Sequence, residues 1–174
     1  ISMIFQEPSV ALNPVTTVGE QIVDAVRRRD HMSRRQARDY ALHLMDLVGI
    51  QDAPSKLGAY PFELSGGLRQ RVMIAAAVAG RPRLILCDEP TTALDVTVQA
   101  QILALFTHLR DEFGAALLYV THDLAVVAQL CDSLTVLYSG KVMESRQDLQ
   151  AALADPRHPY TRALLQSTPD VDRI

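Results

Sequence analysis

Residues 84–90, Leu84-Ile85-Leu86-Cys87-Asp88-Glu89-Pro90, are an apolar run that ends in two adjacent carboxylates and a proline. A short apolar run closed by a turn signal is typical of a buried strand. A helical pattern over about 96–112 follows, starting behind Asp95, and a second strand pattern covers 116–121. Strands joined by a crossover helix pair in parallel. The stretch therefore predicts an α/β fold built on a parallel sheet.

The region before residue 84 is expected to be mostly helical. Two Ser/Thr-x-x-Glu/Gln patterns, at Thr17 and Ser33, have the spacing of a capping box, which starts a helix. Ser65 is a third candidate N-cap. We expect the helices that start at Thr17 and Ser33 to pack into one unit. The expected elements are a strand at 1–5, a loop through Asn13-Pro14, and helices at 17–28, 33–48 and 65–80.

The region after residue 121 contains shorter patterns. A helix is expected at about 124–130, strands near 134–138 and 141–144, and two short helices within 146–174.

Composition excludes several classes of protein. The chain has 174 residues, of which 48% are hydrophobic, enough for one domain with a core. Its net charge of −3 gives no basic field for nucleic acid. No apolar run reaches the roughly 18–20 residues that span a bilayer. Two widely separated cysteines provide no disulfide framework. The chain opens inside a strand pattern without a methionine, so we expect a fragment of a longer protein.

Four polar residues follow three of the expected strands: Gln6, Asp88, Glu89 and His122. Ligands of parallel α/β sheets bind at the carboxyl ends of the strands. Paired acids there suit phosphoryl transfer, with Asp88 in the shell of a magnesium ion and Glu89 polarising the attacking water. Gln6 suits a contact with the metal shell or the water. His122 can reach a terminal phosphate oxygen and hold Glu89 or the water in line.

Structural alternatives remain open for each of these residues. The two acids after residue 87 can form a polar strand end that caps the next helix. His122 can cap a helix beside Asp123, and Gln6 can be a buried amide that satisfies backbone groups.

The stretch Leu64-Ser65-Gly66-Gly67-Leu68-Arg69-Gln70 indicates an anion site at a helix start. A helix N-terminus carries roughly half a positive charge and free N–H groups. Serine there is often a plain N-cap, which is the alternative. Two glycines in the first turn cost roughly 1 kcal/mol each relative to alanine. Close approach of a ligand, here a phosphate, to the backbone offsets that cost.

Taken together, these motifs resemble those of the ATP-binding subunit of an ABC transporter, over essentially the whole chain. In order, Gln6 matches the Q-loop, Leu64 to Gln70 the signature motif, Leu84 to Glu89 the Walker B strand, Thr92-Ala93-Leu94-Asp95 the D-loop, and His122 the H-loop. The resemblance implies a partial RecA-like P-loop NTPase core, with a parallel sheet and an inserted helical subdomain.

The resemblance also implies a division into domains. The implied parts are a core strand ending in the Q-loop (1–6), a helical subdomain with the signature motif (7–80), half of the RecA-like core (81–145) and a C-terminal extension of the oligopeptide-transporter type (146–174).

Three further stretches, 6–14, 89–101 and 158–165, are similar to the oligopeptide, dipeptide and nickel importers. This implies an ATPase that uses ATP and Mg²⁺ to power uptake of peptides or related small solutes. It would lie at the cytoplasmic face of the membrane. Its implied partners are a second ATPase subunit, two permeases and, indirectly, a substrate-binding protein, with no nucleic acid.

In such transporters two ATPase subunits meet head to tail. The residues implied to contact ATP across that dimer are Ser65, Gly66, Gly67, Gln70 and Asp95, while Asp88 and Gln6 serve the metal. The 174 residues contain no G-x-x-x-x-G-K-[ST] motif, so we expect the chain alone to be inactive. One alternative is a non-catalytic partner that presents the signature motif to another subunit's nucleotide. Another is an ABC ATPase acting on DNA or ribosomes, which residues 158–165 disfavour.

Overall fold

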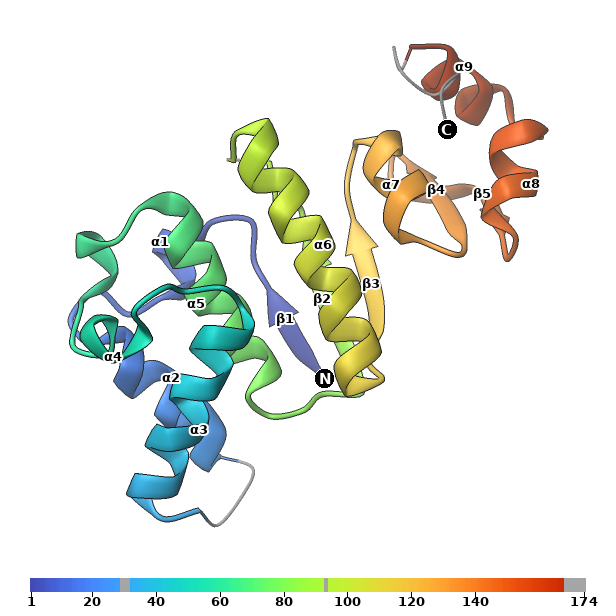
Figure 1. The fold of residues 1–174 in the computed structure, drawn as a ribbon. Coiled ribbons are helices and arrows are strands. Elements are labelled where there is room, and N and C mark those ends of the chain that lie inside the picture. Colours follow the sequence, from blue (N-terminus) through green and yellow to red (C-terminus); the bar gives the residue numbers. More distant parts are fainter. Residues whose placement is uncertain (29–31, 93, 168–174) are drawn as a thin grey trace. The chain divides into compact units, whose positions relative to one another are not determined.

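The computed structural model describes residues 1–28, 32–92 and 94–167. The chain divides into a first unit, Ile1–Val120, and a second unit that begins at Thr121. Figure 1 labels the elements. Those of the first unit are β1 (Ser2–Ile4), α1 (Pro8–Ala11), α2 (Val18–Arg27), α3 (Arg34–Leu47), α4 (Ala53–Lys56), the 3₁₀ turn η1 (Pro61–Glu63), α5 (Gly66–Val78), β2 (Leu84–Asp88), α6 (Val96–Phe113) and β3 (Ala116–Val120). Those of the second unit are α7 (Leu124–Leu130), β4 (Leu134–Tyr138), β5 (Lys141–Arg146), α8 (Leu149–Ala154) and α9 (Pro159–Ser167).

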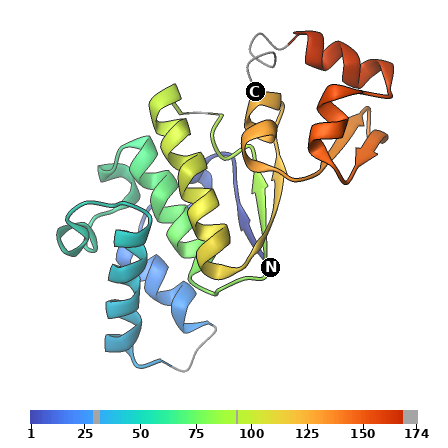
Figure 2. The same cartoon turned by 45° about the vertical axis from the view of Figure 1, so that its right-hand side comes forward.

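The first unit is built on a parallel sheet with the strand order β1-β2-β3, as the sequence predicts. Helix α6 crosses one face of this sheet in both ribbon views (Figures 1 and 2). Ile4 and Cys87 are paired in register and fully buried. On β3 the Tyr119 ring meets the Phe106 ring of α6 edge-on, with centroids 5.8 Å apart. One part of the core of this unit therefore lies between α6 and the sheet.

The opposite face of the sheet is apolar and exposed in this structure. Successive side chains of a strand point to opposite faces. On β3 the residues that alternate with Tyr119 are Leu118 and Val120, which are 56% and 50% exposed. Met3 of β1 is also exposed.

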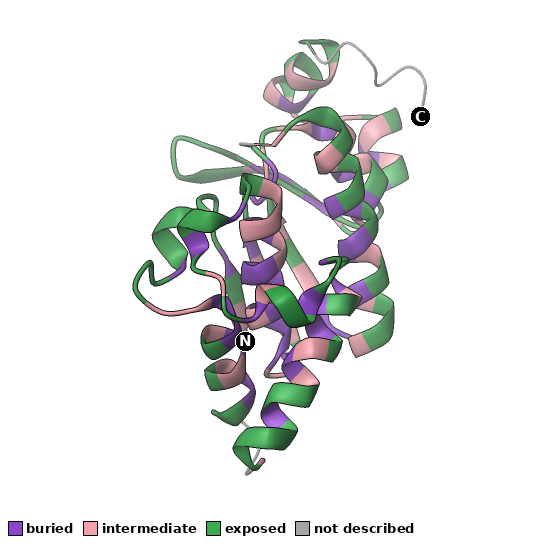
Figure 3. Ribbon diagram, turned by 60° about the vertical axis from the view of Figure 1, so that its left-hand side comes forward, coloured by how far each residue is buried: buried purple, intermediate pink, exposed green. Residues whose placement is uncertain are grey.

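Three long helices, α2, α3 and α5, pack against one another. Each contributes fully buried side chains, among them Ile22, Leu44 and Ile74. Buried residues recur between exposed ones along α2 and α3, whereas Gly66 is the only exposed residue of α5; Figure 3 colours the ribbon by burial. The packing of α2 against α3 confirms the predicted unit, and α5 packs against both of these helices.

The helix starts follow the predicted caps with one correction. The capping box of Ser33 and Gln36 is complete, and Ser65 accepts a hydrogen bond from the Leu68 N–H. The box at Thr17 is only half formed. Thr17 Oγ1 accepts from the Glu20 N–H, but the Glu20 carboxylate accepts from the Thr17 hydroxyl at 3.2 Å instead of from its backbone N–H.

Three short elements were missing from the sequence prediction. Helix α1 occupies part of the expected loop, and α4 and η1 lie between α3 and α5. Each has a proline in its first turn, where the fixed φ of proline suits a helix start. One turn is too short to show the periodicity that identifies longer helices.

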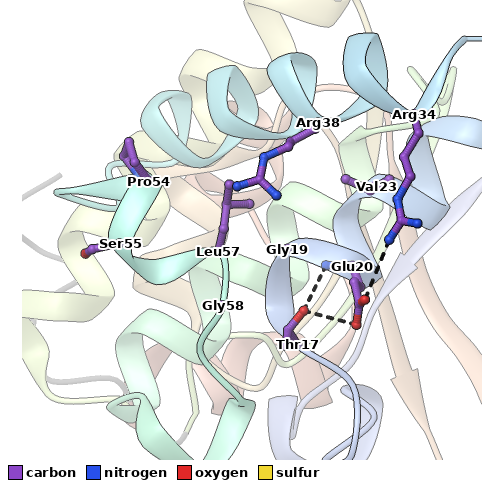
Figure 4. A pocket seen from close by; sticks show the side chains of 10 residues that line it. All are labelled: Thr17, Gly19, Glu20, Val23, Arg34, Arg38, Pro54, Ser55, Leu57 and Gly58. Atoms are coloured by element: carbon purple, nitrogen blue, oxygen red, sulfur yellow. Dashed lines mark hydrogen bonds and ion pairs between the residues drawn. The ribbon is translucent and has the colours of Figure 1, made fainter.

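A cavity of about 510 Å³ lies within the first unit between α2, α3 and residues 54–58. Figure 4 shows Arg34 and Arg38 extending from α3 along it. The Arg34 guanidinium lies 3.9 Å from the Glu20 carboxylate, and both side chains are largely exposed. A pair this open to solvent contributes little to stability.

The second unit contains an antiparallel hairpin of β4 and β5. Its core consists of residues from α7, β4 and α8: Val127, Leu134, Val136, Leu149 and Ala152. The predicted helix at 124–130 and strand at 134–138 are confirmed, and β5 runs two residues further than expected. Across the helices of both units that the structure describes, none is long and apolar enough to cross a membrane.

Candidate functional site

The ends of β1 and β2 bring Gln6 and Glu89 together. The two strands are neighbours, and each residue follows its strand closely. Gln6 Nε2 donates a hydrogen bond to Glu89 Oε2 at 3.3 Å. This confirms that residues 83 positions apart meet at one edge of the sheet. Gln6 is exposed, so the alternative of a buried amide is wrong.

The backbone of Glu89 adopts a left-handed conformation with φ of 42°. Its N–H donates to the Val120 carbonyl at the end of β3, and its carbonyl accepts from the Thr92 N–H. A non-glycine residue held in this region costs about 1–3 kcal/mol, and such strain clusters at functional sites. The sheet edge thus fixes Glu89 in a conformation that it would not adopt by itself.

Thr92 is a contact that sequence reasoning missed. Its hydroxyl donates to Glu89 Oε2 at 2.9 Å, so this oxygen accepts from both Thr92 and Gln6. The sequence predicts Thr92 as part of a loop motif, but not this bond. A Ser or Thr three residues after an acid, in a tight loop, is the signal that could have suggested it.

Asp88 is the last residue of β2, and its side chain is exposed. The neighbouring Cys87 is buried, so the alternation of the strand turns Asp88 away from the α6 side. The alternative that these acids cap the next helix is wrong, because Asp95 caps α6 through a 3.0 Å bond from the Val98 N–H.

The side chains at this edge suit a magnesium ion that also binds water and phosphate, and they do not suit a metal ion coordinated by protein side chains alone. The described residues include no group of three or more His, Cys, Asp or Glu placed to hold a metal. Magnesium usually keeps several waters and takes one or two carboxylates plus phosphate oxygens. One exposed carboxylate, Asp88, beside the amide of Gln6 is consistent with that pattern.

His122 belongs to the second unit and is exposed. It does not cap α7, because that role falls to Asp123, whose Oδ1 accepts from the Ala125 N–H at 2.9 Å. The alternative reading of His122 as a cap is therefore wrong. Its approach to Glu89 stays a prediction.

The two glycines of the signature stretch, Gly66 and Gly67, have different surroundings at the start of α5. A Cβ on Gly67 would lie 3.2 Å from Val98 Cγ1, so close packing against α6 explains this glycine. A Cβ on Gly66 would meet nothing within 4 Å. Ser65 and Gly66 are both exposed. The argument for ligand approach therefore rests on Gly66, with the Ser65 hydroxyl beside it.

Gln70 is only 1% exposed, and its Nε2 has no hydrogen-bond partner among the described residues. It lines a cavity of about 240 Å³ together with Gln6, Gly66, Pro90 and Leu94. The cavity connects the first turn of α5 with the loops that follow β1 and β2. Contact of Gln70 with a nucleotide on another subunit stays a prediction.

Asp95 is exposed at the start of α6, where it acts as the N-cap. Ala93, which belongs to the predicted D-loop, lies outside the described residues. The loop on either side of it positions Thr92 against Glu89 and Asp95 at the helix start.

Known proteins with similar sequences are named as transport ATP-binding proteins. The chain is 52% identical over 170 residues to a probable D,D-dipeptide transport ATP-binding protein of Escherichia coli (strain K12), covering 98% of this chain and 52% of that protein. It is 48% identical over 174 residues to the dipeptide transport ATP-binding protein DppD of Bacillus subtilis (strain 168), covering 99% and 51%. The chain thus spans about half the length of the curated relatives it matches.

A solved structure gives the same fold. The chain is similar to the ATP-binding cassette MJ0796, in a dimeric post-hydrolysis state bound to ADP and Pi, with a TM-score of 0.71 and 30% identity. The similarity covers 84% of this chain and 63% of that one. The ABC transporter family matches residues 1–92, which include Gln6, the start of α5, and Asp88 and Glu89 at the end of β2. Because this match spans more than half of the chain and contains the edge where Gln6 meets Glu89, the chain belongs to the ABC transporter family.

Proposed function

We propose that the full-length protein is an ATP-binding and ATP-hydrolysing subunit that energises an importer of peptides or related small solutes. The observation that carries this proposal is the hydrogen bond from Gln6 to a strained Glu89, beside the exposed Asp88. The relatives of this chain are named as D,D-dipeptide and dipeptide transport ATP-binding proteins, which supports the substrate class.

In this proposal each residue at the sheet edge has a separate role. Glu89 polarises the attacking water, because its carboxylate is held by side chains at the end of β2. Asp88 and Gln6 contact the magnesium ion, which would neutralise charge on the phosphates when bound. His122 contacts the terminal phosphate once nucleotide is present.

A second ATPase subunit completes the proposed site. Groups at the starts of α5 and α6 would face the nucleotide of that subunit: the exposed Ser65, Gly66 and Asp95, the partly buried Gly67 and the buried Gln70. The dimeric state of the similar cassette MJ0796 supports this arrangement. The γ-phosphate suits the N-terminus of α5, where N–H groups and the helix dipole favour an anion.

The proposed assembly divides the chain by function. Residues 1–6 and 81–145 would belong to the ATPase core, 7–80 to the helical part that contacts one of two permeases, and 146–174 to an importer-type extension. Residues 168–174 lie outside the described part. The subunit would act at the cytoplasmic face of the membrane, with a substrate-binding protein as an indirect partner.

The direct test is ATP hydrolysis by the purified full-length protein with and without magnesium. We expect phosphate release that requires magnesium. A folded protein that binds no ATP and releases no phosphate would reject the proposal. Assay of the 174-residue chain by itself is expected to show no turnover.

A second candidate is a non-catalytic partner that presents Ser65 and Gly66 to another subunit's nucleotide. The exposure of both residues at a capped helix start favours it. Mixing the chain with an intact homologous ATPase separates the candidates. Stimulation seen in the mixture and absent from the full-length protein by itself would favour the partner role.

A further inference from the structure

Helices α5 and α6 lie side by side at the turns that follow their N-caps. Near their starts, Gly67 packs against Val98. One turn further, Arg71 Nη2 donates to Gln101 Oε1 at 2.8 Å. Arg71 is six residues after the cap Ser65, and Gln101 is six residues after the cap Asp95. The hydrogen bond therefore joins equivalent turns of the two helices.

Arg71 also holds the end of a third helix. Its Nη1 donates to the carbonyl of Val48, at the C-terminal end of α3. Carbonyls there carry partial negative charge and accept readily from a cation. The guanidinium is partly buried, and this burial lowers the pKa of Arg71. The side chain thus spans α3, α5 and α6 from a partly desolvated position.

Gly49 leaves the space that the guanidinium occupies. This residue has φ of 76°, which favours glycine, and a Cβ there would lie 2.8 Å from Arg71 Nη1. The end of α3 is therefore shaped around Arg71. A guanidinium is a rigid planar fork, so its two bonds fix direction as well as distance.

We propose that Arg71 is a positioning residue for ATP hydrolysis, which sets Ser65 and Gly66 at the start of α5 relative to Asp95 at the start of α6. The inference rests on the proposed function, since these helix starts would face the nucleotide of the second subunit. Arg71 itself touches no nucleotide. Loss of the bond to Gln101 removes a directional link between α5 and α6, so we expect the two helix starts to shift or rotate relative to each other.

The test uses Arg71→Gln and Gln101→Ala in the full-length protein, with kcat and ATP affinity measured separately. A misplacement of about 1 Å can cost about a hundredfold in rate. We expect Arg71→Gln to lower kcat at least about tenfold and Gln101→Ala about threefold, while the Kd for ATP stays within about twofold. In the double variant the losses should be less than additive in free energy, because the residues share one bond.

Arg81→Gln is the matched control. Arg81 Nε donates to the Tyr40 hydroxyl at 3.2 Å, and its guanidinium lies 5.5 Å from that ring. Arg81 therefore also links the α5 region to α3, but beyond the C-terminal end of α5, away from Ser65. The charge change is the same as in Arg71→Gln. We expect its kcat to stay within about twofold of the wild type.

The double variant Arg71→Gln with Gln101→Arg distinguishes a positioning role of Arg71 from a role in stability alone. It restores a guanidinium-to-amide bond between α5 and α6, and we expect kcat at least about threefold above that of Arg71→Gln. Normal kcat per folded molecule in both single variants would overturn the inference. Gln101 is exposed, so Gln101→Ala decides the matter if Arg71→Gln does not fold. A wild type that hydrolyses no ATP would instead reject the proposed function.

Discussion

Glu89 and Glu144 are two strand-associated carboxylates with opposite surroundings. Glu144, on β5 of the second unit, is 7% exposed and accepts from the backbone N–H groups of Arg157 and His158 at 3.1 and 3.0 Å. Arg146 Nη1 lies 3.6 Å from it. Glu89, in the first unit, is half-buried, has a left-handed backbone and accepts from the side chains of Gln6 and Thr92.

The difference separates a structural carboxylate from one suited to chemistry. Burial by itself raises the pKa of Glu144, but the two N–H donors, the Thr161 hydroxyl and Arg146 together hold that pKa below its ordinary value. Main-chain donors cannot rotate away, so Glu144 fixes the start of α9 to the hairpin. The donors to Glu89 belong to exposed side chains that can reorient when a ligand arrives.

The motif at 158–165 has a structural role in the second unit. The His158 N–H donates to the Glu144 carboxylate, and His158 Nδ1 accepts a hydrogen bond from the Tyr160 N–H. The Tyr160 ring lies 4.6 Å from the Tyr138 ring of β4. This motif therefore anchors α9 within the second unit.

The largest effect is expected for Glu89→Gln in the full-length protein. The variant keeps the size of the side chain and loses its charge, so the water loses its base. General-base removal typically costs about 10²–10⁴-fold in rate. We expect kcat to fall in that range while ATP binding, measured by fluorescent-nucleotide titration, is retained.

Glu112→Gln is the control for this change, because Glu112 is an exposed glutamate on α6 away from the sheet edge. Its kcat should equal that of the wild type. Turnover of Glu89→Gln at the wild-type rate would mean that Glu89 is not the base and does not differ from Glu144 in taking part in the reaction.

The sequence predicts the long elements well and the contacts between elements poorly. The span of α3 follows from apolar periodicity, and the starts of α3, α5 and α6 follow from the caps Ser33, Ser65 and Asp95. The parallel sheet follows from a helix between two strands, and from it the meeting of Gln6 with Glu89. These features depend on patterns spread over many residues.

Other features depend on contacts that no local pattern encodes. The left-handed φ of Glu89 is set by the end of β3. The donors to Glu144 come from residues 13 and 14 positions later, and the bond from Arg71 to Gln101 spans 30 positions. The packing role of Gly67 required the position of Val98. The approach of His122 to Glu89 stays a prediction, because the two residues belong to different units.

The next largest effect is expected for Glu144→Ala, and it concerns stability instead of chemistry. The substitution leaves the backbone N–H groups of Arg157 and His158, and the side chain of Arg146, without their acceptor. Removing one partner of such a buried network costs about 2–4 kcal/mol. Urea denaturation of the full-length protein, followed by hydrogen exchange of α9, measures this loss.

Glu112→Ala again provides the comparison, and an exposed site of this kind should change stability by less than about 0.5 kcal/mol. Equal stabilities of the two variants would show that Glu144 does not anchor α9.

A smaller effect is expected for Thr92→Val. Valine has nearly the shape of threonine but cannot donate to Glu89 Oε2. One hydrogen bond to a charged group is worth about 1.5 kcal/mol, so kcat should fall by about tenfold or less, with ATP affinity unchanged. Thr97→Val, which changes an exposed threonine two residues into α6, is the control. Equal rates for both variants would mean that Thr92 does not orient Glu89.

The smallest effect is the acid dependence of the Glu144 contribution. The folded pKa of Glu144 is lowered from the ordinary value of 4.5, so the unfolded chain takes up a proton at higher pH than the folded one. The stability that this charge contributes is therefore fully present above about pH 4.5 and is lost as the pH falls below it, toward the folded pKa. Glu144→Gln carries no charge at any pH. The difference in unfolding free energy between wild type and Glu144→Gln should stay constant down to about pH 5 and then shrink. Urea denaturation at a series of pH values measures it, and a difference that persists unchanged into acid would mean that the main-chain bonds do not depend on the charge of Glu144.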